Sequence, residues 1–124
     1  MKKIITAALF LFASNAAAHE FTPTYPEFSN SFVDGVLVTY MELFNRRTDV
    51  EYYELSVFDE EWNPLPFATP DKLLKINYLE RRRIELFIRE TDKDKVTYIC
   101  SMSKLLSEDV ISSGINSRIC SKVK

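Results

Sequence analysis

The clearest structural signal in the chain is the run Val50-Glu51-Tyr52-Tyr53-Glu54-Leu55-Ser56-Val57-Phe58. Tyr53, Leu55 and Val57 recur with a period of two, and Glu54 and Ser56 lie between them. This alternation puts apolar side chains on one face and polar side chains on the other, which is typical of a half-buried β-strand. We therefore expect a strand over Val50 to Phe58 and use it as the reference for the rest of the chain.

Neighbouring segments repeat the strand pattern. Asp34-Gly35 is a turn signal, and the segment Val36 to Asn45 that follows it is rich in β-branched and aromatic residues. The other predicted strands are an irregular or edge strand at Phe21 to Phe32, which holds Pro23 and Pro26, and strands at Leu73 to Tyr78, Arg81 to Arg89, Val96 to Met102 and Gly114 to Val123. Residues 103–114 leave two alternatives, a long loop or one or two helical turns at Lys104 to Ile111. Roughly seven short strands with turns between them predict an all-β fold, a single antiparallel β-sandwich.

The first eighteen residues have the order of a secretory signal peptide. Lys2 and Lys3 precede the apolar run Ile4 to Ala13, and Ala16-Ala17-Ala18 supplies the small residues of a cleavage site. The apolar run is about half of the length that a bilayer-spanning helix needs. We expect cleavage after Ala18, a domain at 19–124 and an exported protein, in the periplasm, secreted or on the cell surface. A retained membrane anchor is the alternative.

Charge excludes two classes of partner. The chain has 16 basic and 18 acidic residues, and the loss of Lys2 and Lys3 would leave 14 basic residues and a net charge of −4. Nucleic acid and anionic lipid both require clustered basic side chains. Arg81-Arg82-Arg83 is such a cluster, but we expect it to protect a strand edge, with a basic docking patch as the alternative. The prediction is a protein partner, without nucleic acid and without a membrane span in the mature chain, and the oligomeric state stays open.

Two cysteines, Cys100 and Cys120, lie in the expected mature chain. An even number of cysteines in an exported protein favours a disulfide over free thiols or a metal pair. A bridge that closes a loop of this size would stabilise the fold by about 3 kcal/mol.

The segment Asp94-Lys95-Val96-Thr97-Tyr98-Ile99-Cys100 resembles the sixth-strand signature of immunoglobulin-like domains. In that fold the tyrosine forms a structural tyrosine corner, in which its hydroxyl bonds back to the preceding turn. The resemblance thus implies this role for Tyr98. The usual partner cysteine, which would lie near Leu43, is missing, so a Cys100–Cys120 bridge would join the last two strands of one sheet.

The stretch from Phe21 to about Lys104 is similar to the N-terminal immunoglobulin-like domain of periplasmic pilus-assembly chaperones. The similarity rests on the segments Thr22-Pro23-Thr24-Tyr25-Pro26, Leu43-Phe44-Asn45-Arg46, Tyr52-Tyr53-Glu54-Leu55-Ser56-Val57 and Pro64-Leu65-Pro66-Phe67. The pattern also resembles small exported proteins of marine phages and bacteria. Those chaperones have two domains and a first-strand Arg, and Phe21 to Phe32 contains neither Arg nor Lys. The resemblance therefore implies an immunoglobulin-like fold rather than chaperone activity.

Few residues suggest catalysis. His19 is the only histidine, and after cleavage it would be the N-terminal residue, which is the start of a copper brace that lacks its second histidine. We expect His19 on a loose terminus, where it cannot act as a positioned base. Asp59-Glu60-Glu61 and the pair Asp92 and Asp94 could serve a carboxylate-dependent hydrolase or hold calcium weakly, but solvated turns are the expected setting. We expect no catalytic residue, cofactor or metal.

Aromatic residues are abundant, and neighbouring large residues such as Tyr52 and Tyr53 must point to opposite faces of a strand. The candidates for an exposed apolar face are Tyr40, Phe44, Tyr52, Phe58 and Phe87. Such a face marks an interface, unless a loop or residues 103–114 cover it. The sequence predicts a non-enzymatic binding or accessory protein that acts through a sheet edge or this face, with chaperone-like strand addition as one route. A structural component of a phage particle or cell envelope is the alternative.

Overall fold

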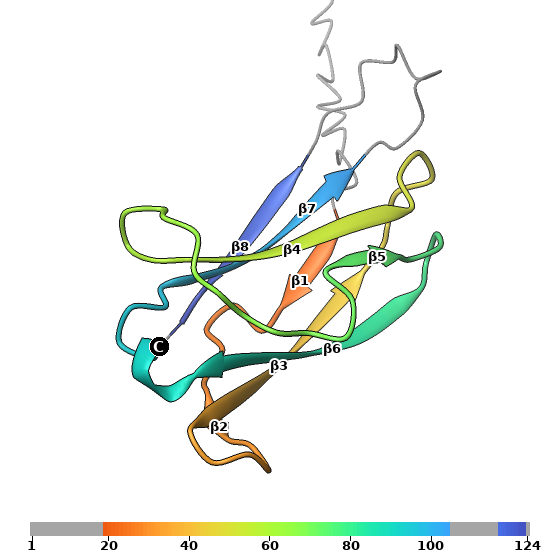
Figure 1. Cartoon of the computed structure of the whole chain (residues 1–124). Coiled ribbons are helices and arrows are strands. Elements are labelled where there is room, and N and C mark those ends of the chain that lie inside the picture. Colours follow the sequence, from red (N-terminus) through yellow and green to blue (C-terminus); the bar gives the residue numbers. More distant parts are fainter. Residues whose placement is uncertain (1–18, 105–116, 124) are drawn as a thin grey trace, which may run out of the picture.

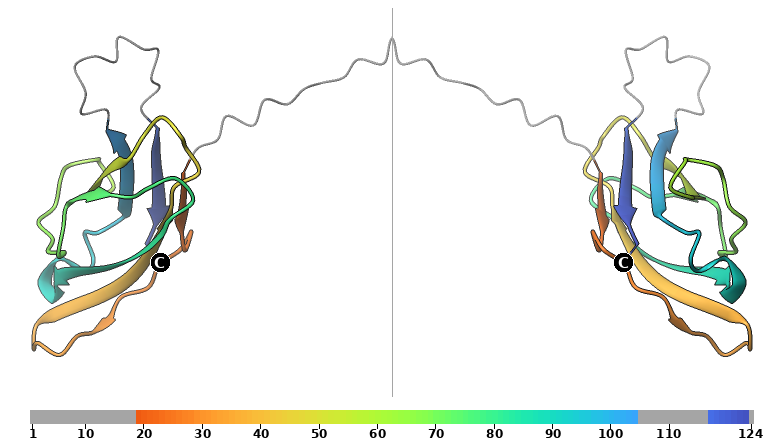
Figure 2. Two further views of the ribbon diagram at one scale, coloured as in Figure 1. Left: turned by 90° about the vertical axis from the view of Figure 1, so that its right-hand side faces the viewer. Right: turned by 90° about the vertical axis from the view of Figure 1, so that its left-hand side faces the viewer.

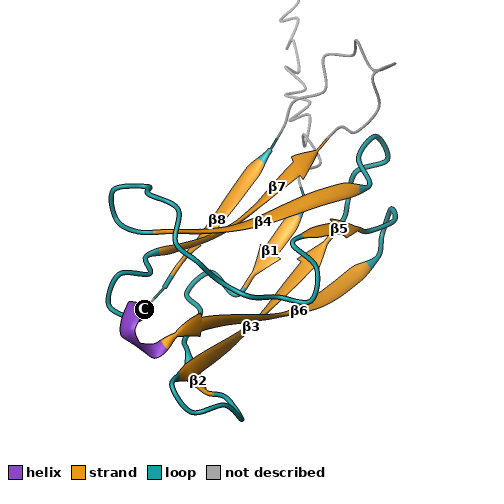
Figure 3. Ribbon diagram, viewed as in Figure 1, coloured by secondary structure: helices purple, strands orange, loops and turns teal. Residues whose placement is uncertain are grey.

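Eight strands form two antiparallel sheets that pack face to face in the computed structural model, which describes residues 19–104 and 117–123 (Figure 1). The strands are β1 (Glu20–Thr22), β2 (Ser29–Asn30), β3 (Val36–Phe44), β4 (Tyr52–Phe58), β5 (Leu73–Lys75), β6 (Arg81–Arg89), β7 (Tyr98–Lys104) and β8 (Arg118–Lys122). Among the described residues, the one helical element is the 3₁₀ turn η1 (Glu90–Asp92), drawn in purple in Figure 3. The predicted all-β, immunoglobulin-like sandwich is confirmed.

The first sheet is built around β3. β6 pairs with β3 along its whole length, from Val36↔Arg89 to Phe44↔Arg81. The other edge of β3 is shared, because β1 pairs near Leu43 and β2 pairs near Leu37. The expected irregular strand at Phe21 to Phe32 is thus two short strands, separated by a segment that contains both prolines, which cannot donate to a β-ladder.

The second sheet has the order β5-β4-β7-β8. Cys100 and Cys120 lie directly opposite each other on β7 and β8, and they form a disulfide. The predicted bridge between the last two strands of one sheet is therefore confirmed.

The core lies between the inner faces of the sheets. The alternation in β4 predicts its buried side correctly, since Tyr53, Leu55 and Val57 are all buried. Leu86 of β6, in the facing sheet, and Ile99 of β7, the partner of Val57 in the same sheet, are completely buried with them. Each such side chain contributes roughly 2 kcal/mol by its removal from water.

The two sides of the sandwich differ. On one side β8 lies beside β1 (Figure 2), and the amide of Lys122 donates to the carbonyl of Thr24 over 3.0 Å. On the other side, β6 of the first sheet and β5 of the second are not paired with each other. β5 is also shorter than the predicted strand at Leu73 to Tyr78, because the chain leaves the sheet after Lys75 and turns at Leu79, which has a positive φ of 61°.

Three sequence expectations lie wholly or partly outside the described residues. These are the signal peptide at 1–18, the segment 103–114 apart from its first two residues, and the first three residues of the strand predicted at Gly114 to Val123. Ser103 and Lys104 themselves belong to β7.

Candidate interaction surface

The five predicted interface residues divide between two faces. Tyr40 and Phe44 on β3 and Phe87 on β6 lie on the outer face of the first sheet. Tyr52 and Phe58 lie on the outer face of the second sheet. The expectation of a single aromatic face is thereby corrected: β3 and β4 follow each other in the chain but belong to different sheets, so their outward side chains point in opposite directions.

On the first sheet, arginines of β6 cover the aromatic rings of β3. The guanidinium of Arg81 lies 4.1 Å from the ring centre of Phe44, and that of Arg83 lies 4.4 Å from the ring centre of Tyr40. The strand register explains both contacts, since Phe44 pairs directly with Arg81, and Tyr40 is the diagonal neighbour of Arg83. Exposed cation–π contacts of this kind contribute about 0.5–1 kcal/mol each.

We call Tyr40, Phe44, Arg81 and Arg83 the aromatic–arginine face. Glu42 lies between the two rings and pairs with Arg81 at 3.0 Å. Tyr40 keeps 42% of its surface exposed, so the arginines leave aromatic surface open to a partner. Arg82 points the other way and contacts the carboxylate of Glu80 at 3.1 Å. The arginine triplet thus supplies two cations to this face and one to the side of the sandwich.

A hollow of about 620 Å³ lies next to this face, at the side of the sandwich between β6 and β5. Its apolar lining includes Leu74 of β5 and Ile84 of β6, and Tyr40 and Arg83 border it from the outer face. The turn Thr69-Pro70-Asp71 and the charged residues Arg82 and Glu85 also line it. Leu74 and Ile84 are themselves buried, so the hollow borders only the margin of the core beside the aromatic–arginine face.

The second sheet carries another aromatic cluster. The rings of Trp62 and Tyr98 stack almost parallel, with their centres 4.1 Å apart. The ring centre of Phe58 lies 5.7 Å from that of Trp62, and the guanidinium carbon of Arg118 lies 5.0 Å from the Trp62 ring centre. Tyr98 therefore has a different contact from the one expected of a tyrosine corner, because the turn that follows β4 places the indole of Trp62 against the Tyr98 ring. Within the described parts of the chain, no hydrogen bond joins the Tyr98 hydroxyl to the preceding turn.

The acidic residues singled out in the sequence, Asp59-Glu60-Glu61 and the pair Asp92 and Asp94, lie in turns and do not form a common site. The carboxylate of Asp59 accepts hydrogen bonds from the amides of Glu61 and Asn63, and the bond from the Asn63 backbone lowers the pKa of Asp59. Asp92 is buried and accepts from Arg89 over 2.8 Å, whereas Asp94 is exposed. Across residues 19–104 and 117–123, no three histidine, cysteine or acidic side chains are grouped to hold a metal ion.

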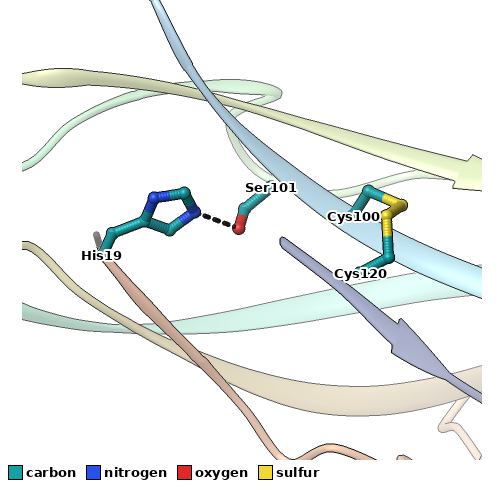
Figure 4. Close-up of a disulfide and its surroundings, with 4 residues drawn as sticks. All are labelled: His19, Cys100, Ser101 and Cys120. Atoms are coloured by element: carbon teal, nitrogen blue, oxygen red, sulfur yellow. Dashed lines mark hydrogen bonds between the residues drawn. A yellow bond between two sulfur atoms is a disulfide. The ribbon is translucent and has the colours of Figure 1, made fainter. Parts of the chain in front are cut away.

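His19 is not on a loose terminus, which corrects the expectation. Its side chain is 1% exposed, and its ring lies 4.7 Å from that of Tyr53. Nε2 lies 2.7 Å from the hydroxyl of Ser101, and Nδ1 lies 3.2 Å from the hydroxyl of Ser117 (Figure 4 shows the first contact). Burial lowers the pKa of His19 to about 4, so the ring is neutral at neutral pH. Both ring nitrogens are engaged, which leaves neither free for copper.

The His19–Ser101 pair has the composition of a base and a nucleophile, but its setting is structural. Ser101 is completely buried, so a substrate cannot reach its hydroxyl. The polar cluster continues through Asn45, whose amide donates to the carbonyls of Val50 and Ile76 and whose oxygen accepts from Tyr53. These polar groups satisfy one another at one end of the core, as buried polar groups must.

Sequence reasoning missed the arginine partners of the aromatic rings and the burial of His19. Both depend on the pairing between distant segments. The sequence offered one clue. Arg81 and Arg83 occupy alternate positions in β6, so their side chains share one face of that strand, as those of Tyr40 and Phe44 do on β3.

Comparison with known proteins supports the fold. No family model and no curated protein matches the chain. Among solved structures, the chain is similar to PapD-like domain 7 of human CEP192, an ASH domain, with a TM-score of 0.56 and 10% sequence identity, over 86% of this chain and 82% of that one. The expected immunoglobulin-like fold is confirmed by this PapD-like neighbour, which shows the fold alone and not a relationship to pilus-assembly chaperones. The expected likeness to phage and marine bacterial proteins finds no support.

The described residues contain no helix with the length and apolar character needed to span a bilayer.

Proposed function

We propose that this protein is an exported, non-enzymatic domain that binds another protein through the aromatic–arginine face. The observation that carries the proposal is the layer of arginines over outward aromatic rings, Arg81 over the half-buried Phe44 and Arg83 over the exposed Tyr40. Tyrosine, phenylalanine and arginine are enriched in protein interfaces, because they bury a large area, and tyrosine and arginine also donate hydrogen bonds.

Rigidity of the scaffold supports the proposal. The face lies on two nine-residue strands that pair over their full length, so its side chains start from fixed backbone positions. Binding at this face would therefore cost this chain little backbone entropy, and the ordering of flexible segments is one of the main costs of association. Sharing a fold with PapD-like domains is compatible with such a role but does not identify the partner.

Export is part of the proposal. The signal-like order of residues 1–18 and the Cys100–Cys120 disulfide both suit an oxidising compartment. N-terminal sequencing of the protein recovered from the periplasm of a bacterial host should begin at His19. A chain that keeps Met1 would contradict cleavage.

The binding test uses the full chain with a C-terminal tag, expressed with its first 18 residues. A double variant, Tyr40→Ala with Arg83→Ala, should lose a stoichiometric partner that the unchanged protein retains during purification. Tyr25→Ala is the matched control, because Tyr25 is 60% exposed and lies outside the face. If the double variant retains the partner at an unchanged melting temperature, or if no partner is captured by any form, the proposal is wrong.

A further inference from the structure

The edge of β6 is covered along only part of its length. Phe87 exchanges two backbone hydrogen bonds with Ala68, of 2.8 and 2.9 Å, and the hydroxyl of Thr69 donates to the carbonyl of Glu85 over 2.8 Å. Pro70 follows and has no amide hydrogen to continue this pairing. The covering segment therefore ends beside Glu85.

Backbone direction along β6 follows from the contact at Phe87. Because the amide and carbonyl of Phe87 point toward Ala68, those of every second residue along the strand also point away from β3. Arg83 and Arg81 lie an even number of residues before Phe87, so their backbone amides and carbonyls point in the same direction as those of Phe87. Their backbone groups thus face the open side of the sandwich, where Arg83 borders the 620 Å³ hollow.

We infer that the edge of β6 from Arg81 to Glu85 binds an extended peptide of a partner protein as an added strand, and this inference rests on the proposed function. The peptide alternates apolar and acidic side chains. Residues opposite Arg83 would exchange two backbone hydrogen bonds with it, as in other strand additions. Two observations carry the inference together: among residues 19–104 and 117–123 no backbone group pairs with Arg83 on this side, and the hollow lies beside it.

The peptide should alternate acidic and apolar side chains, because successive residues of an added strand point to the outer face of the sheet and to the hollow in turn. A residue opposite Arg83 points to the outer face, where Arg83 has no carboxylate partner among the described residues. An acidic side chain there would pair with its guanidinium. The flanking residues point inward, toward the hollow, where Leu74 and Ile84 lie next to Arg82, whose guanidinium donates to the carbonyl of Lys75. Apolar side chains at those positions would extend the core.

The test uses a synthetic probe, acetyl-Val-Asp-Val-Asp-Val-Asp-Val-amide, added to the isotope-labelled protein. We expect the amide of Arg83 to shift and its hydrogen exchange to slow on binding. Arg83→Pro removes the edge amide without touching the β3 ladder, and it should weaken binding by at least about tenfold. Arg83→Ala keeps the amide and should weaken binding less, while Tyr25→Ala should leave it unchanged. The same peptide with Lys in place of Asp should bind more weakly.

Three results would overturn the inference. The shifts could map to β8 instead of β6, the peptide could bind Arg83→Pro as well as the unchanged protein, or the β6 edge could pair with a second copy of the chain as concentration rises. If any one of these results is found while the double variant Tyr40→Ala with Arg83→Ala still loses its protein partner, the proposed function is retained and the strand-addition site is wrong. If neither partner nor peptide binds, both are wrong.

Discussion

His19 and Ser101 are 82 positions apart in the sequence, yet the imidazole Nε2 and the serine hydroxyl lie 2.7 Å apart inside the protein. This contact joins the residue before β1 to the centre of β7 and thereby ties the two sheets together. Burial of the ring, against the smaller opposite effect of this hydrogen bond, keeps His19 neutral, because a charged ring would lose its water contacts without gaining an acidic partner. The burial of His19 therefore makes stability depend on pH.

Acid should destabilise the protein below about pH 6.5. Burial lowers the folded-state pKa of His19 to about 4 from its ordinary value of 6.5, so the unfolded chain takes up the proton first as pH falls. The stabilisation is fully present above pH 6.5 and is lost as pH falls toward 4, by up to roughly 3 kcal/mol. Urea unfolding at pH 7.0, 6.0 and 5.0 measures the loss.

His19→Gln is the control for this pH dependence, since glutamine does not titrate. Its free energy of unfolding should change much less between pH 6.5 and 4.5, whatever its value at pH 7. Asp49, whose pKa the hydrogen bond from Arg47 lowers, contributes stability that is lost only below this window. An equal slope in both proteins would contradict the assignment to His19.

Replacement of Asn45 by alanine should cost about 3 kcal/mol or more of unfolding free energy. Its side chain donates to two backbone carbonyls and accepts from Tyr53 and the amide of Arg47, all without exposure to water. Removal leaves several buried groups unpaired. Asn63→Ala in an exposed turn is the comparison and should cost much less. Similar costs for both variants would show that the Asn45 contacts are not structural.

Loss of the disulfide should lower the free energy of unfolding by about 3 kcal/mol, because the reduced unfolded chain regains the freedom of the closed loop. Cys100 and Cys120 are 20 positions apart, so the loop is of intermediate length. Urea unfolding with and without a reducing agent measures the difference. The double variant Cys100→Ala with Cys120→Ala should not respond to the reducing agent, and any response would point to another reducible group.

Ser121→Ala should stabilise the protein by about 1 kcal/mol. Among the described residues, the hydroxyl of Ser121 is the one buried side-chain group without a hydrogen-bond partner. Alanine removes this unpaired group and little volume. Ser56→Ala, at a half-buried position on β4, should be close to neutral. Thermal unfolding of the two variants distinguishes the effects, and a destabilised Ser121→Ala would mean that this hydroxyl has a partner.

Local pattern was enough to predict most of the fold. The alternation at Tyr53, Leu55 and Val57 identified the buried face of β4, and Asp34-Gly35 marked the turn before β3. Cysteine count and position predicted the bridge between β7 and β8. Each of these features depends on residues that are close in sequence or on simple counting.

What sequence could not give was the pairing of distant segments. The outward aromatic residues of β3 and β4 look alike in the sequence, and only their assignment to different sheets separates Tyr40 from Tyr52. His19 looked like a free terminus because its partners, Ser101 and Ser117, lie far along the chain. The cover of Phe44 by Arg81 likewise depends on the register between β3 and β6.

The most direct test of the central claim is hydrogen exchange, measured by mass spectrometry, on the protein with and without its captured partner. The account predicts slower exchange in the fragments that cover β3 and β6, centred on Tyr40 and Arg83, with β4 and β8 unchanged. Protection confined to β4 or β8, or no protection anywhere in a complex shown to be intact, would contradict the assignment of binding to the aromatic–arginine face.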